Sequence, residues 1–246
     1  MKHLAEGCCV VEPEEGDWRI EGTRRYRVPI SSRMGAQHIA QIVSRFGRGC
    51  SKGWVNPGSE EVHYVVAGEG QCYIDGFSYP LVPGAAVFVP QGAEFAVENG
   101  GGADLTLVSV ACPEEAKRRL SEPARTVPLT SYQAPSRVVL ERERREIATP
   151  QRSFRLLADK DVGCQQVTQF IGYIPPSKAP HHNHPYEEAI YILEGEGTLS
   201  AGGDHAPLRA GASIYLAPRV DHCLENSSRG PFRLLGVIYP AGSPTC

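Results

Sequence analysis

The sequence predicts an all-β fold that consists of two tandem jelly-roll β-barrels related by internal duplication. Three observations lead to this prediction. The 246 residues include 26 glycines and 20 prolines, a share typical of a turn-rich chain. Short β-branched or aromatic segments recur between these turns, as in a sandwich or barrel, and a jelly roll pairs two such sheets. One pattern of residues also occurs twice, about half a chain apart.

The two copies align without a gap when the first is shifted by 127 positions. The segment Tyr64–Gly70 then matches Tyr191–Gly197, and Asn99 matches Asn226. A self-similarity of this length indicates duplication of a whole domain, since solenoid repeats have much shorter periods. We therefore expect a first domain, a linker and a second domain over residues 1–120, 121–150 and 151–246.

Each repeat contains four clear strand candidates, which are rich in β-branched and aromatic residues and bounded by Gly or Pro. The turn Asp75-Gly76 is one of the hairpin signals between them. The candidates cover residues 63–68, 71–76, 85–90 and 105–110 in the first repeat, and 189–195, 197–203, 212–218 and 232–240 in the second.

The segment between the repeats is more highly charged. Residues 113–120 predict a short helix, because Pro113 opens it, Glu114 lies in its first turn and basic residues lie in its last turn. The charged run at 141–146 predicts a solvent-exposed linker.

Composition and charge argue against several classes of protein. The formal net charge is -3, and phosphate recognition needs a basic face, so we expect no nucleic-acid partner. No apolar run approaches the roughly 18 residues that span a bilayer, and Glu6 interrupts the first segment, so we expect no membrane partner and no signal peptide. The eight cysteines form no C-x-x-C pair, as in reduced thiols of a cytoplasmic protein. Jelly-roll edges pair readily between chains, so we expect a homodimer.

A full set of metal-ligand residues occurs in the second repeat. His182 and His184 are two residues apart, so on an extended strand both side chains leave the same face. Glu188 follows on the next strand, and His222 comes from a separate strand after a proline turn. Three imidazoles and one carboxylate can converge on one divalent ion and leave coordination positions open.

The spacing of these residues resembles a known motif. His182-x-His184-x3-Glu188-x6-Gly195 resembles the first cupin motif at every position, and Gly211 through Asn226 resembles the second, with its proline one place late at Pro218. The resemblance covers both repeats, so the chain is similar to the two-domain cupins, or bicupins, whose domains are jelly-roll barrels. It implies one divalent transition metal ion (Fe, Mn, Ni, Cu or Zn) bound by His182, His184, Glu188 and His222.

The first repeat lacks the histidine ligands. Val55, Pro57 and Phe95 stand at the three histidine positions, whereas Glu61 corresponds to the motif glutamate and His63 lies two residues further on. We expect this domain to be a structural or dimerisation partner. The alternative is a metal-free pocket for an organic ligand that uses Glu61 and His63.

Alternation along the strands predicts which side chains face away from the site. Glu187 precedes Glu188 and Glu60 precedes Glu61, so both are expected to point outward. His181 alternates with the ligand histidines and is expected to be a bystander. The candidates for a largely apolar pocket that binds a small-molecule substrate are Phe170, Tyr173, Ile190, Ile192 and Tyr215.

The resemblance leaves the function open, because one scaffold hosts many activities. The first hypothesis is a dioxygenase-type oxidoreductase that acts on a small enolic or phenolic substrate at the metal site, with Glu188 as a catalytic proton acceptor. The second is a manganese-dependent hydrolase similar to ureidoglycine aminohydrolase, whose ligand set matches here only at His184. The third is a non-catalytic protein that binds or senses a metal or a small molecule.

Overall fold

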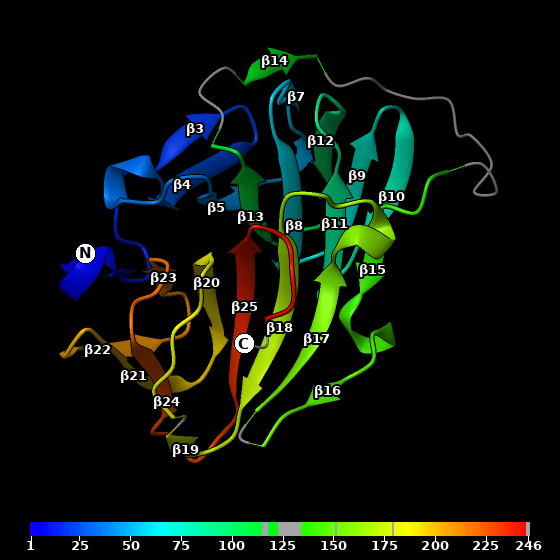
Figure 1. Ribbon diagram of the computed structural model, residues 1–246. Coiled ribbons are helices and arrows are strands. Elements are labelled where there is room, and N and C mark those ends of the chain that lie inside the picture. Colours follow the sequence, from blue (N-terminus) through cyan, green and yellow to red (C-terminus); the bar gives the residue numbers. More distant parts are fainter. Residues whose placement is uncertain (115–117, 123–133, 151, 179, 245–246) are drawn as a thin grey trace.

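The computed structural model describes residues 1–246 except 115–117, 123–133, 151, 179 and 245–246. It has an all-β fold with two jelly-roll barrels, which lie one above the other in Figure 1. The strand candidates of both repeats are strands in the structure. The predicted fold class and the internal duplication are therefore confirmed.

Two facing sheets form the first barrel and enclose a core that includes Trp54 and Phe95. The larger sheet has the order β15 (Val138–Leu140), β11 (Ala85–Val89), β8 (Glu60–Ala67), β13 (Leu105–Cys112), β5 (Ala40–Phe46), β4 (Arg24–Ile30) and β3 (Arg19–Glu21). The smaller sheet has the order β10 (Phe77–Leu81), β9 (Gly70–Ile74), β12 (Glu94–Asn99), β7 (Gly53–Val55) and β14 (Arg119–Ser121), with β6 (Gly49–Cys50) also beside β12.

The second barrel repeats this arrangement around a core that includes Ile190 and Phe232. Its larger sheet has the order β1 (Lys2–His3), β2 (Cys9–Val11), β23 (Ser213–Leu216), β20 (Glu187–Glu194), β25 (Phe232–Tyr239), β18 (Thr168–Ile174), β17 (Ser153–Ala158) and β16 (Ile147–Ala148). Its smaller sheet has the order β19 (Ser177–Lys178), β24 (His222–Asn226), β21 (Glu196–Ala201) and β22 (Asp204–Arg209).

Short 3-10 helices connect some of the strands. Two of them occupy equivalent places in the two repeats and end at glycines with positive φ, Gly35 at 100° and Gly163 at 94°. Glycine adopts this left-handed conformation at little cost, which lets the chain turn sharply after each helix. The 3-10 helices are η1 (Ala5–Gly7), η2 (Ser32–Met34), η3 (Glu141–Glu143) and η4 (Lys160–Val162).

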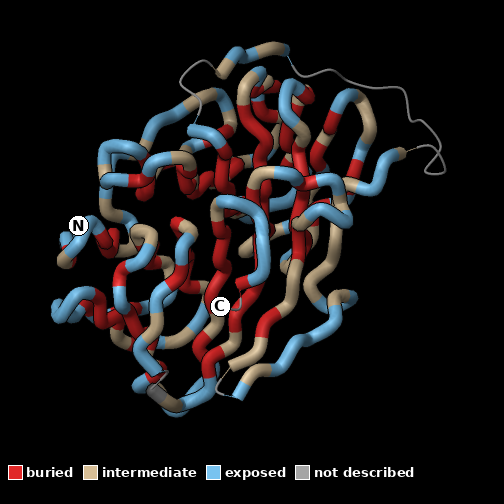
Figure 2. Tube along the Cα trace, in the orientation of Figure 1, coloured by how far each residue is buried: buried red, intermediate tan, exposed pale blue. Residues whose placement is uncertain are grey.

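The outer faces of the two larger sheets pack against each other. Tyr64 and Val108 of the first barrel share one buried cluster with Tyr191 and Leu235 of the second. Figure 2 shows that buried residues concentrate along the strands at the centre of the molecule. The two halves of one chain therefore form a paired unit with a common hydrophobic core between the barrels.

Each repeat begins with a short strand that joins the sheet of the other barrel. At the N-terminus, β2 pairs with β23, and β15 pairs with β11. The N-terminus consequently lies beside the second barrel in Figure 1. The predicted ranges 1–120, 121–150 and 151–246 were drawn from the sequence repeat. In the structure, β2 of the first range belongs to a sheet of the second barrel, and β15 of the linker range belongs to a sheet of the first barrel.

Glu60 and Glu187 point out of their own barrels, but the other barrel covers them. Glu60 accepts a hydrogen bond of 2.7 Å from the backbone N–H of Gln166, and Glu187 accepts one of 2.8 Å from that of His38. Both carboxylates are buried in the contact between the barrels. The alternation of side chains along the strands predicted that Glu60 and Glu187 point outward, but it did not predict their partners in the other barrel.

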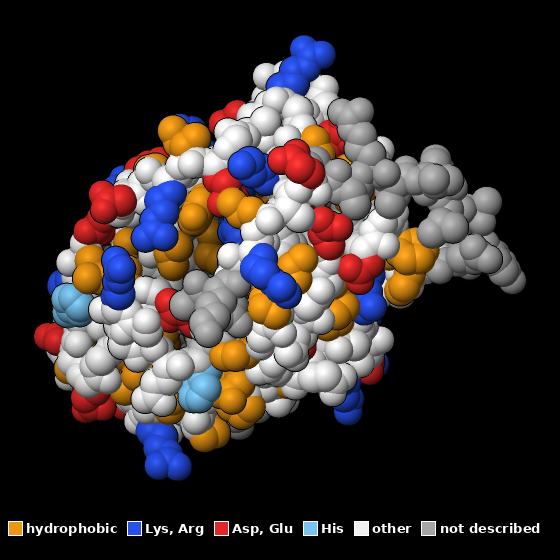
Figure 3. All heavy atoms as spheres, turned by 90° about the horizontal axis from the view of Figure 1, so that it is seen from above, with side chains coloured by type: hydrophobic (Ala, Val, Ile, Leu, Met, Phe, Trp, Pro, Cys, Tyr) orange, Lys and Arg blue, Asp and Glu red, His pale blue; other side chains and the backbone are white. Residues whose placement is uncertain are grey.

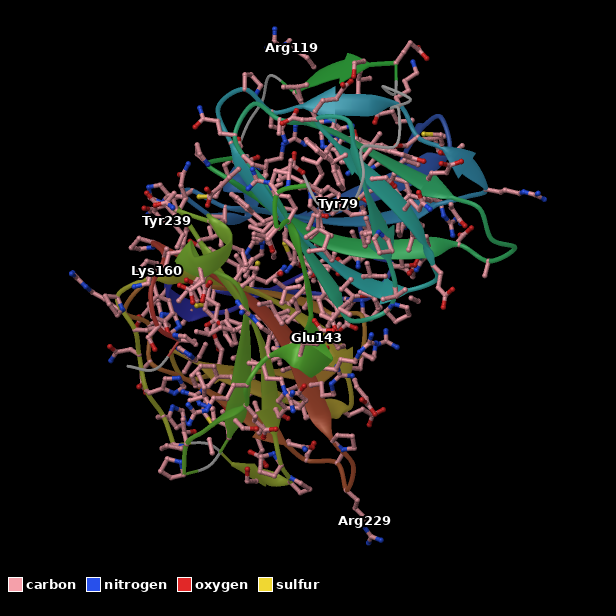
Figure 4. The ribbon with its side chains drawn as sticks, turned by 90° about the vertical axis from the view of Figure 1, so that its right-hand side faces the viewer. Tyr79, Arg119, Glu143, Lys160, Arg229 and Tyr239 are labelled. Atoms are coloured by element: carbon pink, nitrogen blue, oxygen red, sulfur yellow. The ribbon has the colours of Figure 1, made fainter. Side chains whose placement is uncertain are left out.

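The charged run at 141–146 is not a solvent-exposed linker throughout. Glu141 accepts hydrogen bonds from Tyr64 of the first barrel and from Tyr173 and Arg233 of the second. Figure 4 shows this turn, marked by Glu143, beside the junction of the two barrels. A carboxylate that joins both barrels explains why Glu141 is half-buried.

The predicted helix over 113–120 lies partly outside the described residues. Where its end is described, the prediction is wrong, because Arg119 and Leu120 belong to β14 and pair with β7. The open edge of β7 offers backbone hydrogen bonds that outweigh a weak local helix signal.

The surface carries both signs of charge. Figure 3 shows basic and acidic side chains intermixed on the face in view. Among the described residues, no helix has the length and hydrophobicity needed to span a lipid bilayer.

Candidate metal centre

Three residues from two strands and a loop converge inside the second barrel. His184 lies in the loop before β20, Glu188 lies on β20, and His222 begins β24. One potential ligand atom from each lies within 4.8 Å of the others. All three side chains are buried, with exposed fractions of 2%, 7% and 2%. The motif residues that are distant in sequence therefore share one small volume.

Backbone hydrogen bonds hold the ligand loop against β24. His182 and His222 form an isolated antiparallel bridge, with N–O distances of 3.0 and 2.9 Å in the two directions. The N–H of Arg219 donates to the carbonyl of His184 at 2.7 Å. The segment that carries two histidines is thus fixed by the segment that carries the third.

Each histidine of the motif is oriented through its Nδ1 atom. His184 Nδ1 lies 2.7 Å from the carbonyl of Tyr186, and His222 Nδ1 lies 2.9 Å from that of Val220. His182 Nδ1 lies 3.2 Å from the carbonyl of Pro180. Because a carbonyl only accepts, Nδ1 carries the hydrogen and Nε2 presents its lone pair, as in metal-binding histidines.

The surroundings of His182 and His222 favour their neutral imidazole forms. Burial lowers the pKa of His222 to about 4, although the Val220 carbonyl and Glu188 act in the opposite direction. Burial, followed by the positive charge of Arg152, also lowers the pKa of His182. A neutral imidazole is the form that binds a metal ion.

The residues present fit a divalent metal ion. Within the part of the chain that the structure describes, Nε2 of His184 makes no hydrogen bond, and it lies 3.2 Å from Oε2 of Glu188. Because the Tyr186 carbonyl takes the Nδ1 hydrogen of His184, its Nε2 lone pair lies beside the carboxylate, and a bound cation would stabilise that arrangement. Gly236 leaves room for the Phe170 ring and the Glu188 carboxylate, since a Cβ there would collide with that ring and lie 3.0 Å from Oε1 of Glu188.

His182 is near this group but not part of it. Its ring centroid lies 4.5 Å from that of His222 and 6.4 Å from that of His184. Its Nε2 atom lies 3.4 Å from Nη2 of Arg152. The structure thus brings together three of the four predicted ligands, and His182 as the fourth stays a prediction.

A cavity of about 40 Å³ adjoins the cluster. Of the five predicted pocket residues, Phe170, Tyr173 and Ile190 line it, and their role in substrate binding stays a prediction. Apolar and polar residues both line it, and the full set is Arg152, Ser153, Phe154, Phe170, Gly172, Tyr173, Ile174, His182, His184, Tyr186, Glu188, Ile190, His222, Leu224, Leu234 and Pro244.

Two predicted pocket residues do not line this cavity. Tyr215 pairs with Ala189 on the outer face of the sheet, and its hydroxyl donates to Glu187 at 2.8 Å in the contact between the barrels. Ile192 does face inward, but it lies further along β20 and packs into the barrel core. The side chain of Tyr215 lies on the outer face because of the register of β23 against β20, which the sequence does not reveal.

Arg152 is a site residue that the sequence analysis did not identify. It precedes β17, and its guanidinium contributes the one positive charge among the residues that line the cavity. A single arginine after the linker carries no motif or periodicity, so no sequence signal distinguished it.

Protein side chains satisfy the equivalent glutamate of the first barrel. Glu61 accepts hydrogen bonds from Trp54 Nε1 at 3.0 Å and from Asn56, and Nε2 of His63 lies 3.2 Å from its Oε2. Burial alone would raise the pKa of Glu61, but His63 and the charge of Arg24 outweigh it and lower the pKa. The glutamate of the first barrel is therefore stabilised by donors of its own chain, and none of these donors occupies a position equivalent to a motif histidine.

Fold and site together define a two-barrel jelly-roll protein whose described residues contain one potential metal-binding His/Glu cluster, in the second barrel. The cupin domain model matches residues 48–111 and 170–238, which together exceed half of the chain. The chain belongs to the cupin superfamily and carries two cupin domains.

Solved bicupin structures share the fold. Lactobacillus farciminis oxalate decarboxylase in a formate complex has a TM-score of 0.78 at 14% identity, with 94% of this chain and 86% of that chain covered. A mutant of Bacillus subtilis oxalate decarboxylase has a TM-score of 0.76 at 14% identity, with 95% and 78% covered. Protein Ylba from E. coli has a TM-score of 0.73 at 17% identity, with 94% and 90% covered. Identities this low show the fold alone.

One curated relative is similar in sequence over a shorter stretch. It is an uncharacterized protein of Methanocaldococcus jannaschii, 33% identical over 60 residues, or 24% of this chain. The match spans 48% of that protein, about half its length. The name of that protein states no activity.

Proposed function

We propose that this protein is a metal-dependent cupin enzyme with one centre, held by His182, His184, Glu188 and His222. The observation that carries the proposal is the buried convergence of His184, Glu188 and His222, with the Nδ1 atom of each histidine fixed by a carbonyl. When bound, a divalent ion supplies Lewis acidity, and redox chemistry if it is Fe, Mn, Ni or Cu.

The proposed reaction is that of a dioxygenase-type oxidoreductase on a small enolic or phenolic acid. Phe154, Phe170 and Leu234 give the cavity apolar walls that exclude water from the reacting groups. Arg152 offers a guanidinium that can pair with an anionic oxygen of the substrate. Glu188 is the proposed proton acceptor, because it lines the cavity and its Oε2 lies 3.2 Å from Nε2 of His184.

The size of the cavity favours small substrates. A volume of about 40 Å³ corresponds to about three water molecules, so a phenolic acid requires side chains at the rim to move aside. The same size and Arg152 favour a second candidate function, the decarboxylation of a small carboxylic acid. Similar folds include oxalate decarboxylases, one of them in complex with formate.

A substrate screen separates these functions. Protein reconstituted with Fe²⁺ or Mn²⁺ is tested for oxygen uptake with diketones and phenolic acids, and for release of CO₂ from oxalate. Oxygen uptake supports the dioxygenase, and CO₂ release without net oxygen uptake supports the decarboxylase. Hydrolysis of an amide or ureido substrate would instead support the manganese hydrolase. No turnover of any substrate would contradict the enzyme proposal and leave a binding or sensing protein.

Arg152→Gln tests the role of the guanidinium. We expect kcat/KM for an anionic substrate to fall by about ten- to a hundredfold, since a hydrogen bond to a charged group contributes about 1.5–3 kcal/mol. Arg229→Gln is the control, because Arg229 is exposed at the far end of the second barrel in Figure 4. Equal rates in both variants and the wild type would exclude Arg152 from substrate binding.

A further inference from the structure

Glu187 has an unusually complete set of hydrogen-bond donors for a residue outside the site. Its side chain is 2% exposed and accepts from the backbone N–H groups of Gln37 at 2.9 Å and His38 at 2.8 Å. The hydroxyl of Tyr215 donates to it at 2.8 Å, and Nδ1 of His38 lies 3.2 Å from Oε1. A buried carboxylate needs such donors, and here the first barrel supplies most of them.

The position of Glu187 connects this contact to the metal centre. It is the first residue of β20 and directly precedes Glu188, whose side chain leaves the opposite face of the strand. The loop with His182 and His184 enters β20 at this residue. A strand end that follows a loop frays readily unless it is anchored. The donors of Gln37 and His38 anchor the end of β20 that carries the ligands.

The first barrel contains a matched copy of this contact. Glu60, 127 positions before Glu187, accepts from the backbone N–H groups of Gln165 at 3.1 Å, Gln166 at 2.7 Å and Val167 at 3.2 Å in the second barrel. It precedes Glu61, which protein donors satisfy. The two contacts are alike, but only one of them adjoins the proposed metal ligands.

We infer that Glu187 is a positioning residue for the metal centre, through which the first barrel holds Glu188 and the adjoining ligand loop in place. The inference rests on the proposed function, since it assigns the first barrel a role in metal binding at the second. Partners behind the ligands orient them, and their removal weakens metal binding. The first barrel thus contributes to the centre without offering a ligand.

The test compares Glu187→Gln with Glu60→Gln. Glutamine keeps the size of the side chain but replaces one acceptor oxygen by an NH₂ group that cannot accept from a backbone N–H. We expect both variants to lose a similar amount of thermal stability. Only Glu187→Gln is expected to weaken Mn²⁺ binding, by about tenfold or more, measured by calorimetric titration of the metal-free full-length chain. The electron paramagnetic resonance spectrum of bound Mn²⁺ should change in the same variant alone.

Tyr215→Phe provides a milder variant in case Glu187→Gln does not fold. Phenylalanine occupies the equivalent position of the first repeat, Phe88, so the fold accommodates it. It removes one donor to Glu187 and should weaken Mn²⁺ binding severalfold, with little loss of stability. Equal Mn²⁺ affinities in wild type, Tyr215→Phe and folded Glu187→Gln, or equal weakening in Glu60→Gln, would overturn the inference. A wild type that binds no Mn²⁺, Fe²⁺ or Zn²⁺ would overturn the proposed function as well.

Discussion

The two barrels place different residues at equivalent points of one scaffold. In the second, Glu188 faces His184 and His222, and Gly236 leaves space beside it. In the first, Glu61 faces Trp54, Asn56 and His63, while Phe95 stacks on the His63 ring at 4.4 Å. Ser109, the counterpart of Gly236, bonds His63 Nδ1 at 2.7 Å. The same buried glutamate is thus stabilised by protein donors in one barrel and presented beside two histidines in the other.

The asparagine that stabilises a turn of the barrel is the same in both repeats. Asn99 donates to the carbonyls of Phe46 and Ala103, and its counterpart Asn226 donates to those of Ile174 and Gly230. The motif asparagine therefore ties a turn to a neighbouring strand and does not reach the site. A duplicated barrel can therefore keep its turns while a few inward-facing residues determine whether its interior forms a metal site or is filled by side chains.

Giving the second barrel the serine of the first should reduce both its stability and its metal binding. In Gly236→Ser the new Cβ meets the Phe170 ring and Oε1 of Glu188, so either the ring or the carboxylate must move. We expect a loss of about 1–3 kcal/mol in the free energy of unfolding, typical of overpacking, together with weaker Mn²⁺ binding. Denaturant unfolding and metal titration measure the two effects.

Ser109→Gly is the reciprocal control. It removes the hydroxyl that bonds His63, so the first barrel should lose stability while Mn²⁺ binding is unchanged. Unaltered stability and metal binding in Gly236→Ser would show that the glycine is not needed to leave space for the site.

A smaller loss of stability is expected when the carboxylate of Glu141, which joins the two barrels, is replaced. Burial alone would raise the pKa of Glu141, but hydrogen bonds from Tyr173 and Tyr64 and the charge of Arg233 lower it below the ordinary value of 4.5. Glu141 therefore stabilises the fold above pH 4.5, and this contribution is lost as the pH falls through its folded pKa. At pH 7, Glu141→Gln should lower the free energy of unfolding by about 1.5 kcal/mol.

Unfolding of wild type and Glu141→Gln between pH 7 and pH 3 measures this contribution. The difference between them should shrink as the pH falls below 4.5. Glu14→Gln serves as the control, because Glu14 is the counterpart of Glu141 but is 56% exposed beside Arg45, and exposed pairs contribute little. A difference that does not depend on pH would mean that the charge of Glu141 does not stabilise the junction.

The sequence predicted the parts of this molecule that depend on local spacing. The all-β fold and the duplication follow from alternation and from the repeat. The convergence of His184, Glu188 and His222 follows from the spacing that resembles the cupin motifs. The direction of Glu187 was predicted, but its partners Gln37 and His38 were not, because they lie in the other barrel.

The remainder depends on contacts between distant segments. Tyr215 was placed in the pocket because one step of strand register reverses its face. Arg152 was missed because it reaches the cavity from the turn before β17, where no pattern marks it. The exchange of β2 and β15 between barrels was also unforeseen, since neither strand differs in composition from other short strands.

The most direct test of the account is the metal content of the full-length chain, measured by elemental analysis after reconstitution with Mn²⁺ and dialysis. We predict about one ion per chain in the wild type and in His181→Ala, whose side chain is exposed, and almost none in His222→Phe, which copies Phe95 of the first barrel. Two ions per chain would contradict a first barrel whose buried glutamate is satisfied by protein donors. No ion in the wild type would contradict the metal centre itself.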